Sequence, residues 1–214
     1  MAQLREMTSG PSLPLILNFT FPLLLGNLLQ QTYSLVDAAI VGRFLGIDAL
    51  GMAMATYSGQ NYGAGKPERI WMGVKSATLM MVVYSLAIAA VMWGLADKFA
   101  LLFISPDETE IMKDTVLFLH INTSAFMLLG LLSILHYTIQ GVGFTRLSMF
   151  SGVSEMVARI LVSLFLVPAL KFPGVCLGDP TAWLFANLFL VPAFYYVYRH
   201  LKQSVVLQHV PVNS

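Results

Sequence analysis

Long stretches without charge are the feature that most constrains the fold of this chain. Residues 7–36, 76–96, 115–145 and 181–198 contain no Asp, Glu, Lys or Arg. A helix needs about 20 apolar residues to cross the hydrocarbon core of a bilayer. Helices also pair every backbone N–H and C=O within their own segment, as hydrocarbon requires. The chain is therefore predicted to be an all-α integral membrane protein, with a single membrane domain over residues 1–214.

Glycine, proline and polar residues divide the chain into six predicted helices. We expect them at residues 12–44, 48–61, 70–99, 113–140, 146–170 and 180–201, with Pro173-Gly174 ending the fifth. The first helix is too long for a signal peptide and has no small-residue cleavage site at its end, so we expect it to be retained. The second helix would span only about 21 Å, less than the core of about 30 Å, and whether it fully crosses stays open.

The basic residues indicate an orientation in the membrane. If all six helices cross, seven Lys and Arg lie on one side and four on the other, and the second side also carries the acidic loop between residues 97 and 114. Basic residues accumulate on the cytoplasmic side. We therefore predict a multi-pass protein of the plasma membrane with both termini in the cytoplasm.

Several function classes lack their sequence patterns. No HExxH, GxSxG, Walker or CxxC pattern occurs, so an enzyme is not expected. Cys176 is the single cysteine, and His120 and His136 stand too far apart for a metal pair, so no metal site and no cofactor are predicted beyond a coupling ion. No basic run suits nucleic acid.

The first predicted helix carries a polar wedge in an otherwise leucine-rich segment. At 100° per residue, one face collects Asn27, Gln30, Tyr33, Ser34 and Asp37. A carboxylate facing lipid costs about 2.5–3.5 kcal/mol, so Asp37 is expected to face protein or water. There it would exchange a proton or hold a sodium ion. The alternative is an aspartate that simply reaches the membrane interface.

Two further features of the predicted helices are a proline within the first and a pair of charges within the fifth. Pro22 removes a hydrogen bond inside the first helix, so we expect a kink there, either a hinge or a static bend. Glu155 and Arg159 are spaced i, i+4 in the fifth helix, so they share a face. They would form a salt bridge that fixes packing, or Glu155 would also titrate in a cavity. A third alternative is that both charges lie near the cytoplasmic interface, because Arg146 is only nine residues before Glu155.

A glycine-rich polar stretch covers the end of the second helix and the turn after it. Glycines permit close helix packing, and amide side chains can pair the free backbone groups of a helix end. We therefore expect a packing or hinge element there. It is formed by Gly59, Gln60, Asn61, Gly63 and Gly65.

Two blocks of sequence resemble one known family. The first comprises PLILNFTFP at residues 14–22, QQTYSLVD at 30–37 and VGRFLG at 41–46. The second comprises GQNYGAG at 59–65, QGVG at 140–143 and SGVSEMVARI at 151–160. The first block resembles the first helix of the multidrug and toxic compound extrusion (MATE) family, and the second resembles helices of that family's C-terminal lobe.

The resemblance implies an antiporter that expels amphipathic or cationic small molecules in exchange for Na⁺ or H⁺. It implies a coupling role for Asp37 and makes Glu155 the candidate acid of the second lobe. Family members have two six-helix lobes, whereas this chain has about half their length. Residues 12–46 resemble the first lobe and 52–202 the second, with a seam near 49–54. One six-helix lobe would result, which a homodimer could complete.

Two alternatives to an antiporter stay open, one from the shortened length and one from a related branch of the superfamily. The chain could be a truncated fragment that transports nothing. It could instead resemble a flippase of lipid-linked oligosaccharides, which would require cationic side chains along its cavity.

Overall fold

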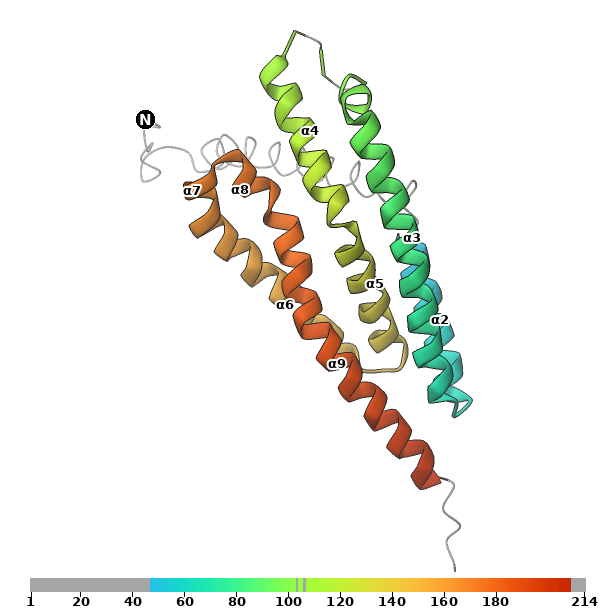
Figure 1. The fold of residues 1–214 in the computed structure, drawn as a ribbon. Helices are drawn as coiled ribbons and strands as arrows, with labels where there is room; N and C mark the ends of the chain where they lie inside the picture. The colour runs from blue at the N-terminus through green and yellow to red at the C-terminus, as the bar shows by residue number, and fades with distance from the viewer. Residues whose placement is uncertain (1–46, 103, 106, 209–214) are drawn as a thin grey trace, which may run out of the picture. The chain divides into compact units, whose positions relative to one another are not determined.

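The computed structural model describes residues 47–208 except residues 103 and 106. Contacts divide the chain into two units, Met1–Gly46 and Ile47–Ser214, and the description below concerns the second. Helices make up its regular structure, and no strand occurs among the described residues (Figure 1). The predicted all-α fold is confirmed.

The first two helices of this unit, α2 (Ile47–Gly63) and α3 (Pro67–Ala100), form a hairpin. Gly65 turns the chain with φ +65°, a conformation that glycine adopts without steric cost. Pro67 then occupies the first turn of α3, where its missing N–H leaves no unpaired acceptor. The two predicted helices at 48–61 and 70–99 thus form, each a few residues longer than expected.

Small residues let α2 approach α5 (Phe126–Gly141) closely. A Cβ atom on Gly59 would lie 2.9 Å from the carbonyl oxygen of Gly141, and one on Gly141 would collide with the backbone of Ala55. One turn before Ala55 on α2, Gly51 lies against the ring of Tyr137. Spacing of small residues by four along α2 is the arrangement that permits close helix contact in membranes.

The prediction of one continuous helix at 113–140 is wrong, because the structure has two helices there. α4 (Thr109–Ser124) and α5 meet at Ala125 with a bend of 46°. Two hydroxyls just before the bend donate to carbonyls four residues back, Thr123 Oγ1 to Leu119 at 2.6 Å and Ser124 Oγ to His120 at 2.7 Å. Such bonds bend helices.

The predicted helix 146–170 is continuous in direction but irregular. It consists of α6 (Thr145–Leu161), a π-helical turn η1 (Val162–Leu166) and a final turn α7 (Val167–Leu170). The π turn directly precedes Pro168, which has no N–H and would crowd the carbonyl four residues back. The helix ends at Leu170, as predicted, but the break is made at Lys171, with φ 56°, and not at Pro173-Gly174.

Those two residues lie instead in the short helix α8 (Phe172–Cys176). The last helix, α9 (Gly178–Gln208), packs along both α6 and α5. α5 is therefore the centre of the unit, between α2 and α3 on one side and α6 and α9 on the other (Figure 1). The residues most deeply buried in this core include Ile134, Ile139 and Leu190.

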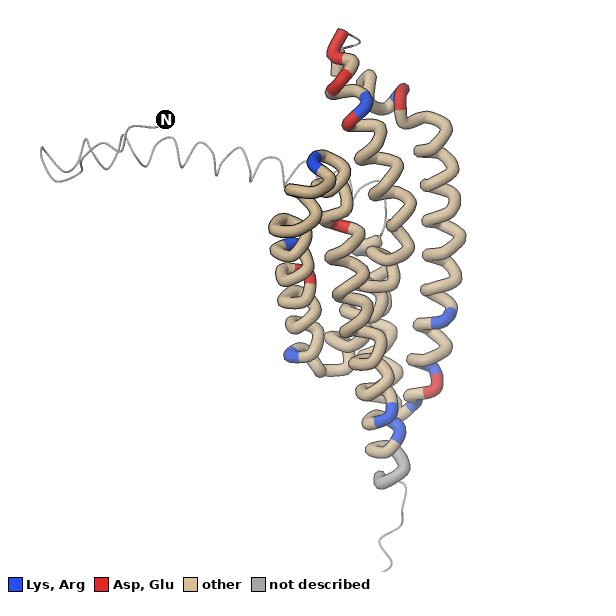
Figure 2. The backbone as a smooth tube through the Cα atoms, turned by 60° about the vertical axis from the view of Figure 1, so that its left-hand side comes forward, with Lys and Arg blue, Asp and Glu red and all other residues tan. Residues whose placement is uncertain are grey.

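Three helical segments of the described residues are long and apolar enough to cross a membrane. They are Pro67–Ala100, Thr145–Leu170 and Phe172–Ser204, and the bent pair α4–α5 makes a fourth if it is one span. α2 has 17 residues and does not meet that criterion. Charged residues gather toward the two ends of these spans, with few between (Figure 2).

Candidate functional site

The polar wedge and the kink predicted in the first helix lie outside the described residues. This holds for Pro22, Asn27, Gln30, Tyr33, Ser34 and Asp37. Their assignment stays a prediction from sequence. The part of the predicted site that the structure describes is on α6.

Glu155 and Arg159 lie one turn apart on α6, as their spacing requires. The ion pair of Arg159, however, is made with another residue: its Nη2 lies 3.1 Å from Oδ1 of Asp179, in the first turn of α9. The expected Glu155–Arg159 salt bridge is therefore corrected to an Arg159–Asp179 bridge between two helices. Sequence reasoning missed Asp179, although an acid directly before Pro180 at a helix start was a usable sign.

Both residues of this ion pair belong to the apolar spans. Arg159 is 14 residues from Thr145 and 11 from Leu170, which corresponds to about 21 Å and about 16 Å at 1.5 Å per residue. Asp179 is seven residues beyond Phe172, the start of its own span. Glu155, Arg159 and Asp179 thus all lie inside helical segments that are long and apolar enough to cross a membrane.

Glu155 and Arg159 also line an open groove of about 490 Å³ along α6 and η1. The groove is lined by Gly152, Glu155, Met156, Arg159, Ile160, Ser163 and Leu164. All of its lining residues belong to one continuous helical segment, so this unit supplies only one wall. The Arg159 side chain is 54% exposed and that of Asp179 is 38% exposed.

The groove side of α6, which bears Glu155 and Arg159, is called the α6 face below. Its exposed charges indicate what kind of surroundings this face has in the membrane. Charged groups facing lipid are costly and rare in membrane helices, and they usually face a bundle interior or a water-filled cavity. The π turn at the end of the groove agrees with this reading, because π turns occur frequently at functional sites. The α6 face is therefore the best candidate site among the described residues.

The bend between α4 and α5 carries a second polar cluster. Trp93 of α3 stacks on His120 at 4.6 Å and donates from Nε1 to Ser124 Oγ at 3.1 Å. Asn187 of α9 donates to the carbonyl of Leu128 at 2.7 Å, so it pairs a backbone oxygen near the break. The polar residues of this cluster therefore stabilise the bent α4–α5 segment through contacts with α3 and α9.

His136 contributes a contact between helices. Its Nδ1 lies 3.1 Å from Oγ of Ser151 on α6. This contact joins α5 to α6. The Nε2 atom of His120 has no hydrogen-bond partner in the described part of the chain.

The glycine-rich stretch closes α2 and turns the chain. Asn61 Nδ2 donates to the carbonyl of Tyr57 at 2.8 Å, and the carbonyl of Gln60 accepts from the amide of Ala64 at 3.0 Å. Gly63 has open space around it, while Gly65 supplies the positive φ. Its residues therefore contribute helix packing and turn geometry.

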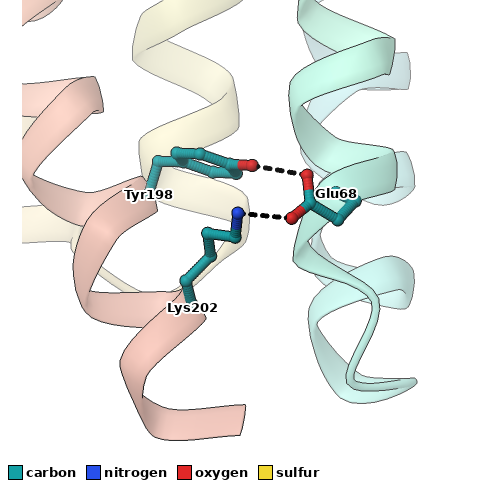
Figure 3. Close-up of polar contacts among 3 residues, drawn as sticks. All are labelled: Glu68, Tyr198 and Lys202. Atoms are coloured by element: carbon teal, nitrogen blue, oxygen red, sulfur yellow. Dashed lines mark hydrogen bonds and ion pairs between the residues drawn. The ribbon is translucent and has the colours of Figure 1, made fainter. Parts of the chain in front are cut away.

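A polar contact joins α3 to α9 at the end of the unit where α2 also ends. Glu68 accepts from Tyr198 Oη at 2.7 Å and from Lys202 Nζ at 2.5 Å (Figure 3). Trp71 stacks beside this contact on Phe194 and Tyr198, with centroids 5.7 and 5.2 Å away. Aromatic rings and basic residues of this kind are typical of a membrane–water interface.

Comparison with known proteins decides the family. The family model MatE matches residues 47–165, which is more than half of the 214-residue chain. The chain belongs to the MatE family. Members of this family are transporters, so the protein is a membrane protein of a transporter family and not of an enzyme family.

The MatE match extends from the start of α2 into η1 and therefore includes Glu155 and Arg159. Asp179 lies beyond the matched residues. Searches of the curated proteins and of the solved structures found no match to this chain. The resemblance noted for the second block of sequence thus agrees with the MatE match.

Proposed function

We propose that this MatE-family chain is a cation-coupled antiporter that exports organic cations by alternating access. The observation that supports it is the groove on α6, where Glu155 and Arg159 lie among apolar residues within a helical segment long enough to cross a membrane. Acidic groups in such places mark ion and substrate pathways. Glu155 would attract an amphipathic cation, and the apolar residues of the groove would contact its hydrophobic part.

Asp37 is proposed as the coupling residue on the strength of the sequence. A carboxyl on a polar face of an apolar helix can alternate between a bound proton or Na⁺ and a free state. Binding of the ion would change the hydrogen bonds of Gln30 and Tyr33, and Pro22 would let the helix bend. The coupling ion would be the protein's only required cofactor.

The cavity needs a second wall, and we propose that a second copy of the chain provides it. The groove has one wall, its charges are unsuited to lipid, and the family resemblance implies two parallel lobes. A two-fold homodimer would place two α6 faces opposite each other. We further propose that the end bearing Glu68 and Lys202 faces the cytoplasm of the plasma membrane, because basic residues gather there.

The flippase alternative finds less support. A flippase of lipid-linked oligosaccharides would need a free cation for the phosphate. Arg159 is already paired with Asp179 of α9, and the formal charges of Glu155, Arg159 and Asp179 sum to a negative value.

Efflux in reconstituted vesicles tests the proposed function. A fluorescent monovalent cation should leave vesicles against its gradient when an opposing Na⁺ or H⁺ gradient is applied. D37N and E155Q should each reduce this rate at least tenfold, whereas E108Q, in the exposed loop before α4, should not. A wild-type protein without gradient-driven efflux would contradict the proposal and favour a non-transporting fragment.

A further inference from the structure

Arg159 has two carboxylates within its reach, and it binds the more distant one in sequence. Glu155 lies one helical turn away on the same face, where i, i+4 pairs ordinarily form. Asp179 is twenty residues further along the chain and belongs to α9. The 3.1 Å contact nevertheless joins Arg159 to Asp179.

The fold explains this choice. The chain turns at Lys171, passes through α8 and starts α9 alongside α6, which brings Asp179 to the level of Arg159. α6 and α9 then pack along each other. Arg159 thus pairs with Asp179 on α9, whereas Glu155, which lines the same groove as Arg159, has no ion pair among the described residues.

The charge count of the cluster follows. Arg159 neutralises one carboxylate, and Glu155 is left as a single uncompensated acid among apolar groove residues such as Met156 and Ile160. A lone acid at this depth favours one positive charge as its partner. Two such charges, or none, would leave a net charge in the bilayer core.

We infer that Asp179 is a positioning residue that engages the guanidinium of Arg159 in an ion pair, so that the carboxylate of Glu155 stays available to bind one monovalent cation. This inference rests on the proposed function, because it specifies the ligand of the same groove. The cation is an organic monocation, a proton or Na⁺, and these compete for one carboxylate. Without Asp179, Arg159 forms its ion pair with Glu155 instead and blocks the cation site.

Labelling with a hydrophobic carbodiimide tests the inference without relying on transport. The reagent modifies protonated carboxyls in apolar surroundings, and mass spectrometry identifies the modified residue. In wild-type protein in vesicles, Glu155 is expected to be labelled and Asp179 to be protected by its ion pair. Tetraphenylphosphonium should protect Glu155, and choosing Na⁺ or pH as the competitor separates the other two cations.

The variants make the test specific. D179N should reduce labelling of Glu155 about tenfold, the change that about 1.4 kcal/mol produces, because Arg159 now pairs with it. The double variant R159Q/D179N should restore labelling, which misfolding of D179N could not do. R159Q alone should expose both acids to the reagent. D97N, an exposed aspartate at the end of α3, serves as the matched control and should change nothing.

Two results would overturn the inference. One is Glu155 labelling that D179N leaves unchanged, and the other is wild-type Glu155 that tetraphenylphosphonium does not protect. The outcome is separate from that of the efflux assay. If efflux occurs while the labelling pattern fails, the antiporter stands and the role of Asp179 is rejected. If the pattern holds without efflux, the site exists but the chain alone does not transport.

Discussion

Single atoms decide how closely the helices of this protein approach one another. The clearest case is Gly141, because the backbone of Ala55 occupies the space that a side chain at this position would need. A backbone neighbour cannot rotate away, whereas the end of a flexible side chain can. The close contact between α2 and α5 therefore requires glycine, which has only a hydrogen atom in place of a side chain, at position 141.

Replacing Gly141 by alanine should destabilise the protein. Overpacking of this kind costs about 1–3 kcal/mol, so the midpoint of thermal unfolding in detergent should fall by several degrees. G94A is the matched control, because the same methyl group on α3 meets open space and alanine favours helix more than glycine. Equal midpoints for the two variants would show that α2 and α5 are less close than described.

At the scale of elements, apolar run length predicted where helices occur but not their irregularities. The helices near 48–61 and 70–99 follow from charge-free sequence bounded by glycine and proline. The bend at Ala125 depends on whether Thr123 and Ser124 bond to the backbone or to neighbours, which spacing does not reveal. The Arg159–Asp179 pair was equally hidden, because it results from the path of the chain through α8.

The bend should relax when its hydroxyls are removed. In T123A/S124A, two carbonyls regain ordinary helical partners, and the 46° angle between α4 and α5 should decrease. Spin labels at Glu110 and Gln140, in a background with Cys176 replaced by alanine, report this change. At 1.5 Å per residue their separation should lengthen from about 41 Å toward about 45 Å.

The matched control for this measurement is T138A. The hydroxyl of Thr138 has no hydrogen-bond partner among the described residues, so its loss should leave the separation unchanged. A distance that is the same in all three proteins would place the cause of the bend elsewhere, for example in the bond from Asn187 to Leu128.

For the whole molecule, the unanswered question is what lies opposite the α6 face. The family, the fold class and the membrane setting could be predicted from sequence, because they depend on motifs and on apolar length. The assembly could not, because a groove with one wall is compatible with both a dimer and a non-transporting fragment. The seam near residues 49–54 and the role of Asp37 also stay predictions.

Cysteine crosslinking in membranes tests the proposed homodimer. Met156 on α6 and Met80 on α3 are both exposed, by 56% and 63%. In the background without Cys176, M156C should form covalent dimers with a short bis-maleimide, because two α6 faces oppose each other. M80C should remain monomeric on a lipid-facing helix. Dimers that form equally with both, or with neither, would contradict the proposed arrangement.

The contact of Glu68 with Tyr198 and Lys202 has a consequence for how the protein responds to its bilayer. Headgroup phosphates of anionic lipids offer Lys202 the same kind of acceptor as the exposed Glu68 carboxylate. A membrane rich in such lipids would compete for the ammonium group and loosen the tie between α3 and α9. Lipid charge would then set how stiffly this end of the protein is held, without any ligand entering the groove.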